Sequence, residues 1–150
     1  MLEDIGIFLV LNIRFGDGLM LTINYKQIYE TSESGEKQWV LILYDISANH
    51  YVGVPVYSKE NDGCLYLKSI DKYVDVNRIG DYNRTKMSRC IYQKRKPLKL
   101  SDKDFNKLIH SCKDSLVSFF DNNISGDIDG ISYLKWCRDK YNLNSKDIEI

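Results

Sequence analysis

Six short runs of β-favouring residues occupy most of the first two thirds of the chain, at residues 5–13, 19–25, 38–46, 50–56, 64–70 and 88–93. Polar turn clusters separate most of these runs, at residues 16–18, 32–35, 47–49 and 60–63. Many short strands at such close spacing favour a small barrel or a strongly bent sheet. We therefore expect a small, twisted, antiparallel, barrel-like sheet.

The pattern changes after Pro97. The sequence Ser-Asp-Lys-Asp at residues 101–104 is a capping box, and apolar residues follow it at helical spacing. They are Phe105, Leu108, Ile109, Cys112, Leu116, Phe119 and Phe120. A second helix is predicted over residues 132–141, with Tyr133, Trp136 and Cys137 on one face. The predicted fold class is α+β, with helices packed on the sheet.

The size and charge of the chain set limits on its function. With 150 residues, 43% of them hydrophobic, residues 1–150 are expected to form a single domain. The 21 basic residues balance the 21 acidic ones, so no whole-molecule field attracts the protein to nucleic acid or membrane. A basic binding site must therefore be local.

The cysteines and the N-terminal region predict a cytoplasmic protein without a metal or cofactor. Cys64, Cys90, Cys112 and Cys137 are widely spaced and form no C-x-x-C pair, which argues against a zinc site and favours reduced thiols. The apolar run at residues 5–13 follows two acidic residues and has about half the apolar length of a membrane span. We interpret this run as a strand.

A dense basic segment offsets the neutral total. Residues 84–99 hold seven of the 21 basic residues and no acidic residue. Tyrosine and serine lie among the cations, and base stacking joined to phosphate contacts is the usual combination for single-stranded RNA. The candidate RNA-binding residues are Arg84, Lys86, Ser88, Arg89, Tyr92, Lys94, Arg95, Lys96 and Lys99. The alternative is a solvated strand edge whose lysines prevent aggregation.

Two neighbouring strands carry polar residues at one shared end. Residues 35–46 and 50–59 are typical of a β-hairpin, in which Lys37 precedes the first strand and Tyr57, Ser58 and Lys59 close the second. In an antiparallel pair these positions meet at the same end. Cations and hydroxyls are then expected to converge on one phosphate.

The same two blocks resemble a known toxin family. The sequences GEKQWVLILYDI (residues 35–46) and HYVGVPVYSK (50–59) are similar to the lysine strand and the proline-then-Thr-Ser turn of the ToxN and AbiQ toxins of type III toxin–antitoxin systems. Residues 22–28 resemble a segment near the start of those proteins, which makes residues 1–19 an extension or an extra strand. Beyond Lys59 the likeness is general and extends to the wider MazF and PemK toxin fold.

The resemblance implies a metal-independent endoribonuclease, in which the ribose 2′-hydroxyl attacks the adjacent phosphate to leave a cyclic phosphate and a 5′-hydroxyl. Lys37 would then stabilise charge and protonate the leaving oxygen, and Ser58 would hold the scissile phosphate. Tyr57 stands where the better-known members have threonine, and Lys59 follows the serine directly, without the intervening residue of the relatives. The resemblance implies two partners, an RNA substrate and a small antitoxin RNA of pseudoknotted repeats that links toxins into a closed assembly.

Several alternatives stay open at this point. Without the resemblance, Lys37 and Ser58 are a strand-end lysine and a turn serine. A histidine has an ordinary pKa near neutrality and is a candidate general base, but His50 opens the second strand, so we expect a surface histidine far from Ser58. The loop at residues 121–132 fits much of an EF-hand but ends on Ser132 instead of glutamate, which favours a plain turn. The rival functions are a MazF-like toxin with a protein antitoxin, a non-catalytic RNA-binding barrel and a calcium-responsive module.

Overall fold

The computed structural model describes residues 21–47, 49–123 and 129–141. The described β-strands are β1 (Ile28–Thr31), β2 (Gln38–Ser47), β3 (His50–Tyr57), β4 (Cys64–Leu67), β5 (Lys72–Asp75), β6 (Gly80–Asn83), β7 (Met87–Cys90), β8 (Tyr92–Gln93) and β9 (Lys96–Pro97). The helices are the 3₁₀-helix η1 (Arg84–Lys86) and the α-helices α2 (Asp102–Asn123) and α3 (Gly130–Tyr141). The strand expected at residues 5–13 and the extension at residues 1–19 lie outside the described residues.

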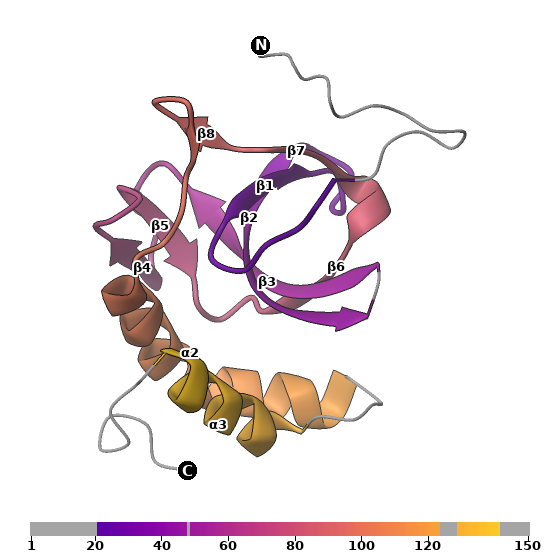
Figure 1. The fold of residues 1–150 in the computed structure, drawn as a ribbon, viewed down its shortest axis with the longest axis vertical. Helices are drawn as coiled ribbons and strands as arrows, with labels where there is room; N and C mark the ends of the chain where they lie inside the picture. The colour runs from indigo at the N-terminus through magenta and orange to yellow at the C-terminus, as the bar shows by residue number, and fades with distance from the viewer. Residues whose placement is uncertain (1–20, 48, 124–128, 142–150) are drawn as a thin grey trace.

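The main sheet has seven strands in the order β4-β5-β3-β2-β1-β7, with β6 pairing β3 beside β5. Every strand pair in the described part of the chain is antiparallel. The predicted α+β class is confirmed, and Figure 1 shows both helices together on one side of a strongly curved sheet. The edge strands β4 and β7 do not pair with each other among these residues, so the sheet is not closed into a barrel.

The alternation of side chains along β2 and β3 divides the apolar residues between two clusters. Leu41 and Val54 are register partners and belong to the larger cluster, which also includes Phe105 of α2. Val40 and Tyr51 lie on the other face, in a smaller cluster. The period of two places the two apolar sets on opposite faces of the sheet, and the larger set packs against the helices.

The N-terminus of α2 follows the predicted cap in part. The Ser101 hydroxyl accepts a hydrogen bond from the backbone N–H of Asp104 at 3.1 Å, as a capping box requires. The Asp104 carboxylate does not return this bond, because it accepts from the backbone N–H of Ser69 at 2.7 Å. The cap therefore also fastens α2 to the turn between β4 and β5.

The second predicted helix is confirmed as α3, which begins at Gly130, two residues before the predicted start. A Cβ atom at Gly130 would lie 2.3 Å from the Cα of Val117, so only glycine allows α3 to approach α2 this closely. The Asp129 carboxylate accepts from the backbone N–H of Ser132 at 2.7 Å and caps the helix.

Three strand predictions need correction. The described part of the run at residues 19–25 is not a strand, and the chain instead bends at Lys26, whose φ is 71°, just before β1. The run at residues 64–70 ends as a strand at Leu67, because a turn follows in which Leu67 accepts from the backbone N–H of Ile70. The run at residues 88–93 is divided into β7 and β8 at Ile91, whose side chain is buried.

Four short strands, β1, β5, β6 and β9, are absent from the sequence prediction. Their sequences, such as KYVD in β5 and GDYN in β6, are too short and too polar to show an apolar alternation. Each is stabilised as a strand by its partner in the sheet rather than by its own composition.

Candidate functional site

The register of the β2–β3 pair builds the predicted corner. Trp39 pairs with Val56, and the same register continued by two residues places Lys37 opposite Ser58. A cleft of about 490 Å³ lies at this end of the hairpin. Its described lining residues are Ser34, Glu36, Lys37, Gln38, Trp39, Val56, Tyr57, Ser58 and Arg78. The cleft thus contains Lys37, Tyr57 and Ser58 of the four predicted catalytic residues, whereas Lys59 is exposed and does not line it.

Hydroxyl and amide groups give the cleft a polar wall. The Gln38 side-chain amide donates to the phenol oxygen of Tyr57 across 3.4 Å. This long hydrogen bond holds a half-buried tyrosine, while Lys37 and Ser58 stay exposed to an incoming ligand. An ammonium, an alkyl hydroxyl and a phenol therefore share one opening, a combination suited to a phosphate group.

Arg78 is a cleft residue that the sequence analysis missed. It follows β5 in a turn closed by its backbone N–H, which donates to the carbonyl of Asp75 at 3.1 Å. Burial raises the pKa of the neighbouring Tyr82 to about 12, and the charge of Arg78 opposes that shift. Nothing in the local sequence predicts that Arg78 lies near Ser58, because only the pairing of β3 with β5 and β6 brings the two residues together.

Lys72 is a second cation near the cleft that sequence reasoning did not identify. Tyr57 pairs with Tyr73, so the register places Lys72 beside Ser58. The Lys72 ammonium lies 5.6 Å from the centroid of the Trp39 ring, within the range of a cation–π contact. This end of the sheet therefore presents lysines from both β5 and the chain just before β2.

Glu30 connects the cleft with the basic strand β7. It pairs with Trp39 on one side and with Arg89 on the other. Its carboxylate lies 3.3 Å from Arg89 Nε and accepts from the Ser88 hydroxyl at 3.1 Å. Desolvation raises the pKa of Glu30, but these hydrogen bonds and the charges of Arg89 and Lys37 outweigh it and hold the pKa below its ordinary value.

The sheet separates the basic segment into two parts. Lys86 lies at the cleft end, where its carbonyl accepts from the backbone N–H of Ser32 at 3.0 Å, whereas the backbone N–H of Arg84 donates to the carbonyl of Asn49 at 2.7 Å, beside the far end of β3 from Ser58. The Arg84 guanidinium donates to the Leu21 carbonyl at 2.9 Å. From there β7 runs away from the cleft, and its continuation at Ile91 donates to the Ile28 carbonyl at the opposite end of β1.

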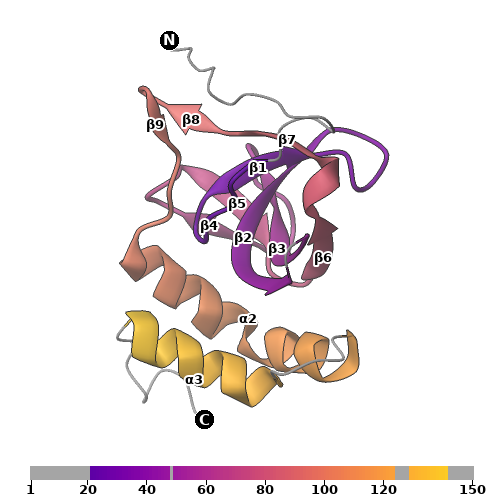
Figure 2. The same cartoon turned by 45° about the vertical axis from the view of Figure 1, so that its right-hand side comes forward.

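The remaining basic residues belong to the β8–β9 hairpin and the chain that follows it. Tyr92, Lys94, Arg95 and Lys96 lie on the hairpin, and Lys99 forms a backbone bridge with Gln27. The sequence predicts a groove between the corner and residues 84–99, but none of these residues is among the described residues that line the cleft. Figure 2 shows the hairpin projecting from the side of the molecule away from α3.

His50 and the EF-hand-like loop do not join the cleft. His50 Nδ1 lies 3.0 Å from Asp81 Oδ1, at the far end of β3 from Ser58. Residues 124–128 of the loop lie outside the described residues, and the Asp121 carboxylate accepts from the backbone N–H of Gly130 at 3.1 Å. Within residues 21–47, 49–123 and 129–141, no three His, Cys, Asp or Glu side chains form a cluster suited to a metal ion.

The cysteines are all free thiols in the structure. Burial raises the pKa of both Cys112 and Cys137 to about 12, which suppresses their thiolate forms. In the described part of the chain, no helix combines the length and the apolar character needed to cross a membrane.

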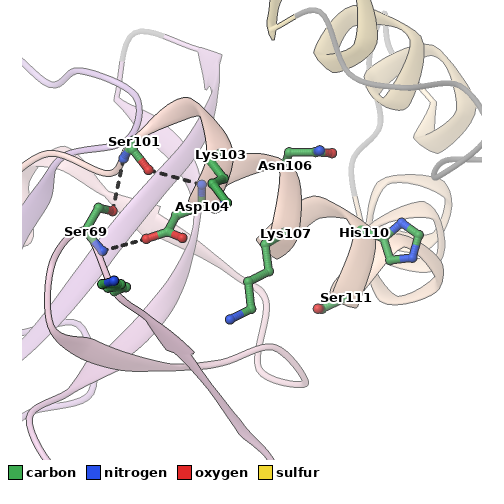
Figure 3. Close-up of a pocket in the computed structure, with 9 residues that line it drawn as sticks. Ser69, Ser101, Lys103, Asp104, Asn106, Lys107, His110 and Ser111 are labelled. Carbon is green, nitrogen blue, oxygen red and sulfur yellow. Dashed lines mark hydrogen bonds between the residues drawn. The ribbon is translucent and has the colours of Figure 1, made fainter.

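A larger cavity of about 800 Å³ lies between the β4–β5 turn and the first turns of α2. Figure 3 shows that Ser69, Ser101 and Asp104 at one end of it are joined by hydrogen bonds. Lys107 also lines it and donates to the Tyr66 carbonyl at 3.1 Å. These groups hold α2 on the sheet, and none of the predicted site residues lines this cavity, so we assign the chemistry to the smaller cleft.

Comparison with protein-family models and with curated proteins gives no match to this chain.

Proposed function

We propose that this chain is a metal-independent endoribonuclease whose active site is the cleft at the open end of the β2–β3 hairpin. The observation that carries the proposal is the convergence of Lys37, Tyr57, Ser58 and Arg78 in one opening. Two cations and two hydroxyls are the groups that bind a phosphodiester and stabilise the charge of its transition state.

The proposed reaction is an internal transfer. The ribose 2′-oxygen forms a bond to phosphorus while the bond from phosphorus to the 5′-oxygen breaks. Glu36, a carboxylate that lines the cleft, takes the proton of the 2′-hydroxyl, and the Lys37 ammonium gives a proton to the leaving 5′-oxygen. Ser58 and Tyr57 donate hydrogen bonds to the phosphate, and Arg78 neutralises its additional charge.

The biological role included in the proposal is that of a cytoplasmic toxin of a type III toxin–antitoxin system. Its support is the likeness of residues 22–28, 35–46 and 50–59 to ToxN and AbiQ, together with the strong curvature of the sheet, which suits a barrel-like toxin fold. A small repeated RNA would occupy the cleft as inhibitor and assemble with the toxin into a closed complex. A cleft that binds phosphate serves substrate and inhibitor alike.

The test of the proposal is cleavage of single-stranded RNA by purified protein freed of bound RNA, in excess EDTA. We expect products with a 2′,3′-cyclic phosphate and a 5′-hydroxyl, identified by end-group analysis, and no products from the Lys37→Ala variant. Loss of cleavage on chelation, or products with a 5′-phosphate, would contradict the mechanism.

A non-catalytic RNA-binding protein is the second candidate. It is favoured by the absence of histidine among the described residues of the cleft, which leaves no side chain with an ordinary pKa near neutrality. In that case wild-type protein would bind single-stranded RNA without cutting it, and Lys37→Ala would weaken binding only.

A further inference from the structure

The β8–β9 hairpin ends in an unusual two-residue turn. Tyr92 pairs with Pro97 and Gln93 with Lys96, which leaves Lys94 and Arg95 at the tip with φ values of 51° and 68°. A turn with two positive φ values normally uses Asn-Gly, and a residue with a Cβ atom costs about 1–2 kcal/mol in this conformation. The chain therefore places two cations where local stability favours asparagine and glycine.

The base of the hairpin is firmly anchored. Ile91 and Leu98, on either side of it, are only 4% and 7% exposed and belong to the large apolar cluster. The backbone N–H of Leu98 donates to the Ile91 carbonyl at 2.8 Å, and that of Ile91 donates to the Ile28 carbonyl at 2.9 Å. The tip is thus held by the core rather than carried on a long loop.

The side chains of the hairpin are open to a partner. Tyr92 is 60% exposed, and Lys94, Arg95 and Lys96 are exposed as well. In contrast to Arg84, Ser88 and Arg89, these four side chains make no hydrogen bond, ion pair or ring contact within the part of the chain that the structure describes. Three cations beside an aromatic ring form a surface for phosphates and a stacked base.

The hairpin and the cleft lie at opposite ends of β7. The chain advances by five residues from Lys86, at the cleft end, to Ile91, at the base of the hairpin, which is roughly 16 Å of extended chain. Two further strand spacings of about 4.8 Å each separate β7 from β2, since β1 lies between them. One phosphodiester group therefore cannot contact both regions.

We infer that the β8–β9 hairpin is a second RNA-binding site, which holds the backbone and a base of the RNA several nucleotides away from the bond that is cut. This inference rests on the proposed function. RNA is favoured over an acidic protein because the exposed Tyr92 adds base stacking to the phosphate contacts, and because Lys86, just before β7, is a further exposed cation at the cleft end of the sheet. The hairpin contributes affinity for long RNA and leaves the chemical step to the cleft.

The test uses the double variant Lys94→Asn/Arg95→Gly, which removes both charges while giving the turn its preferred residues. Two substrates are compared, a dinucleotide that fills the cleft alone and a single-stranded RNA of twenty nucleotides. We expect the dinucleotide kcat/KM to stay within twofold of wild type. For the long RNA we expect a roughly tenfold higher KM and a salt slope reduced by about 1.4, since each lost phosphate contact on a single strand lowers it by about 0.7.

Matched variants separate the effect of the hairpin residues from the effect of a lower overall positive charge. Lys68→Gln/Lys103→Gln removes the same charge from the α2 side, and we expect it to leave the activity on both substrates unchanged. Tyr92→Phe should retain the affinity for long RNA, because the ring still stacks, whereas Tyr92→Ala should weaken it several-fold. A polyglutamate competitor should not displace the RNA, and its displacement of the RNA from wild type but not from the hairpin variant would instead assign the site to acidic protein.

Two outcomes would overturn the inference. The first is an unchanged affinity and salt slope of the double variant for long RNA, and the second is an equal loss of activity on the dinucleotide and the long RNA. If wild-type protein cleaves neither substrate, the proposed function fails, and fluorescence anisotropy of the twenty-nucleotide RNA with the same variants still decides whether the hairpin binds RNA.

Discussion

The cleft and the β8–β9 hairpin are both polar and exposed, but the chain builds them in different ways. The cleft takes its residues from three separate segments, residues 34–39, 56–58 and 78, which only the sheet register brings together. The hairpin is six consecutive residues, 92–97, closed by one local turn. A site whose residues are brought together by strand register is sensitive to the fold of the whole sheet. A site formed by one hairpin can change its charge without disturbing the sheet.

The largest expected effect is on cleavage by the cleft variants. Lys37→Ala and Ser58→Ala should each lower the rate of RNA cleavage by about two to three orders of magnitude, since a contact to the transition-state charge is typically worth that much. Both variants should also abolish toxicity on expression while keeping the circular dichroism spectrum of wild type.

Lys59→Ala is the matched control, because Lys59 is an exposed lysine next to Ser58 that does not line the cleft. Its rate should stay within about fivefold of wild type, the range of an exposed charge. If Lys37→Ala kills cells as wild type does, the cleft is not the active site.

The second-largest expected effect is on the stability of the fold. It compares a substitution in the β2–β3 pair, which sets the register of the cleft, with a substitution in the local turn of the β8–β9 hairpin. A Cβ atom at Gly53 would lie 2.6 Å from Val40 Cγ2 and 2.8 Å from the Leu41 carbonyl oxygen. Gly53→Ala should therefore lower the free energy of unfolding by about 1–3 kcal/mol, the usual cost of overpacking.

Urea unfolding followed by circular dichroism measures this loss of stability. The hairpin variant Lys94→Asn/Arg95→Gly should unfold at the same urea concentration as wild type or slightly above it, because its turn is relieved of strain. Equal destabilisation by Gly53→Ala and by the hairpin double variant would remove the distinction between the two regions.

A smaller effect concerns the salt dependence of RNA binding. Neutralising Lys94, Arg95 and Lys96 together should lower the slope of log affinity against log salt by about 2, at about 0.7 for each single-strand phosphate contact. Titrations at several salt concentrations provide the slope. An unchanged slope would show that the hairpin is only a solvated strand edge, which is the alternative interpretation of this segment.

The smallest predicted effect comes from Glu30, which lies between the cleft and β7. Because its pKa is depressed, Glu30 is ionised at neutral pH, and its pairing with Arg89 is lost only as pH falls through that lowered pKa. Glu30→Gln should release Arg89 for phosphate and raise RNA affinity roughly twofold to fivefold at pH 7. Anisotropy at pH 7 measures the gain, and weaker binding by the variant would show that Glu30 instead positions Arg89 for RNA.

The sequence predicted the long elements of the fold well, for a physical reason. β2 and β3 match the predicted runs to within one residue at each end, because each carries enough β-favouring apolar residues to define a strand by itself. α2 begins where its capping serine predicts. Short strands such as β5 and β6 could not be found, since their strand conformation depends on pairing with β3.

The same distinction applies to the candidate site. Lys37 and Ser58 were predicted to lie together because Lys37 precedes the first strand of a hairpin and Ser58 follows the second. An antiparallel hairpin always brings these two positions to the same end. Arg78 and Lys72 reach this end through strands that the sequence did not reveal. The separation of the basic segment was equally hidden, because it depends on the direction in which β7 runs along β1.

The most direct test of the cleavage mechanism uses an RNA in which a single ribose, on the 5′ side of the main cleavage point, lacks its 2′-hydroxyl. If the 2′-oxygen is the nucleophile, wild-type protein should bind this RNA with unchanged affinity and fail to cut that bond, while cutting the all-ribose RNA in the same buffer with EDTA. Cleavage at the substituted position at the ordinary rate would contradict internal attack and with it the roles proposed for Glu36 and Lys37.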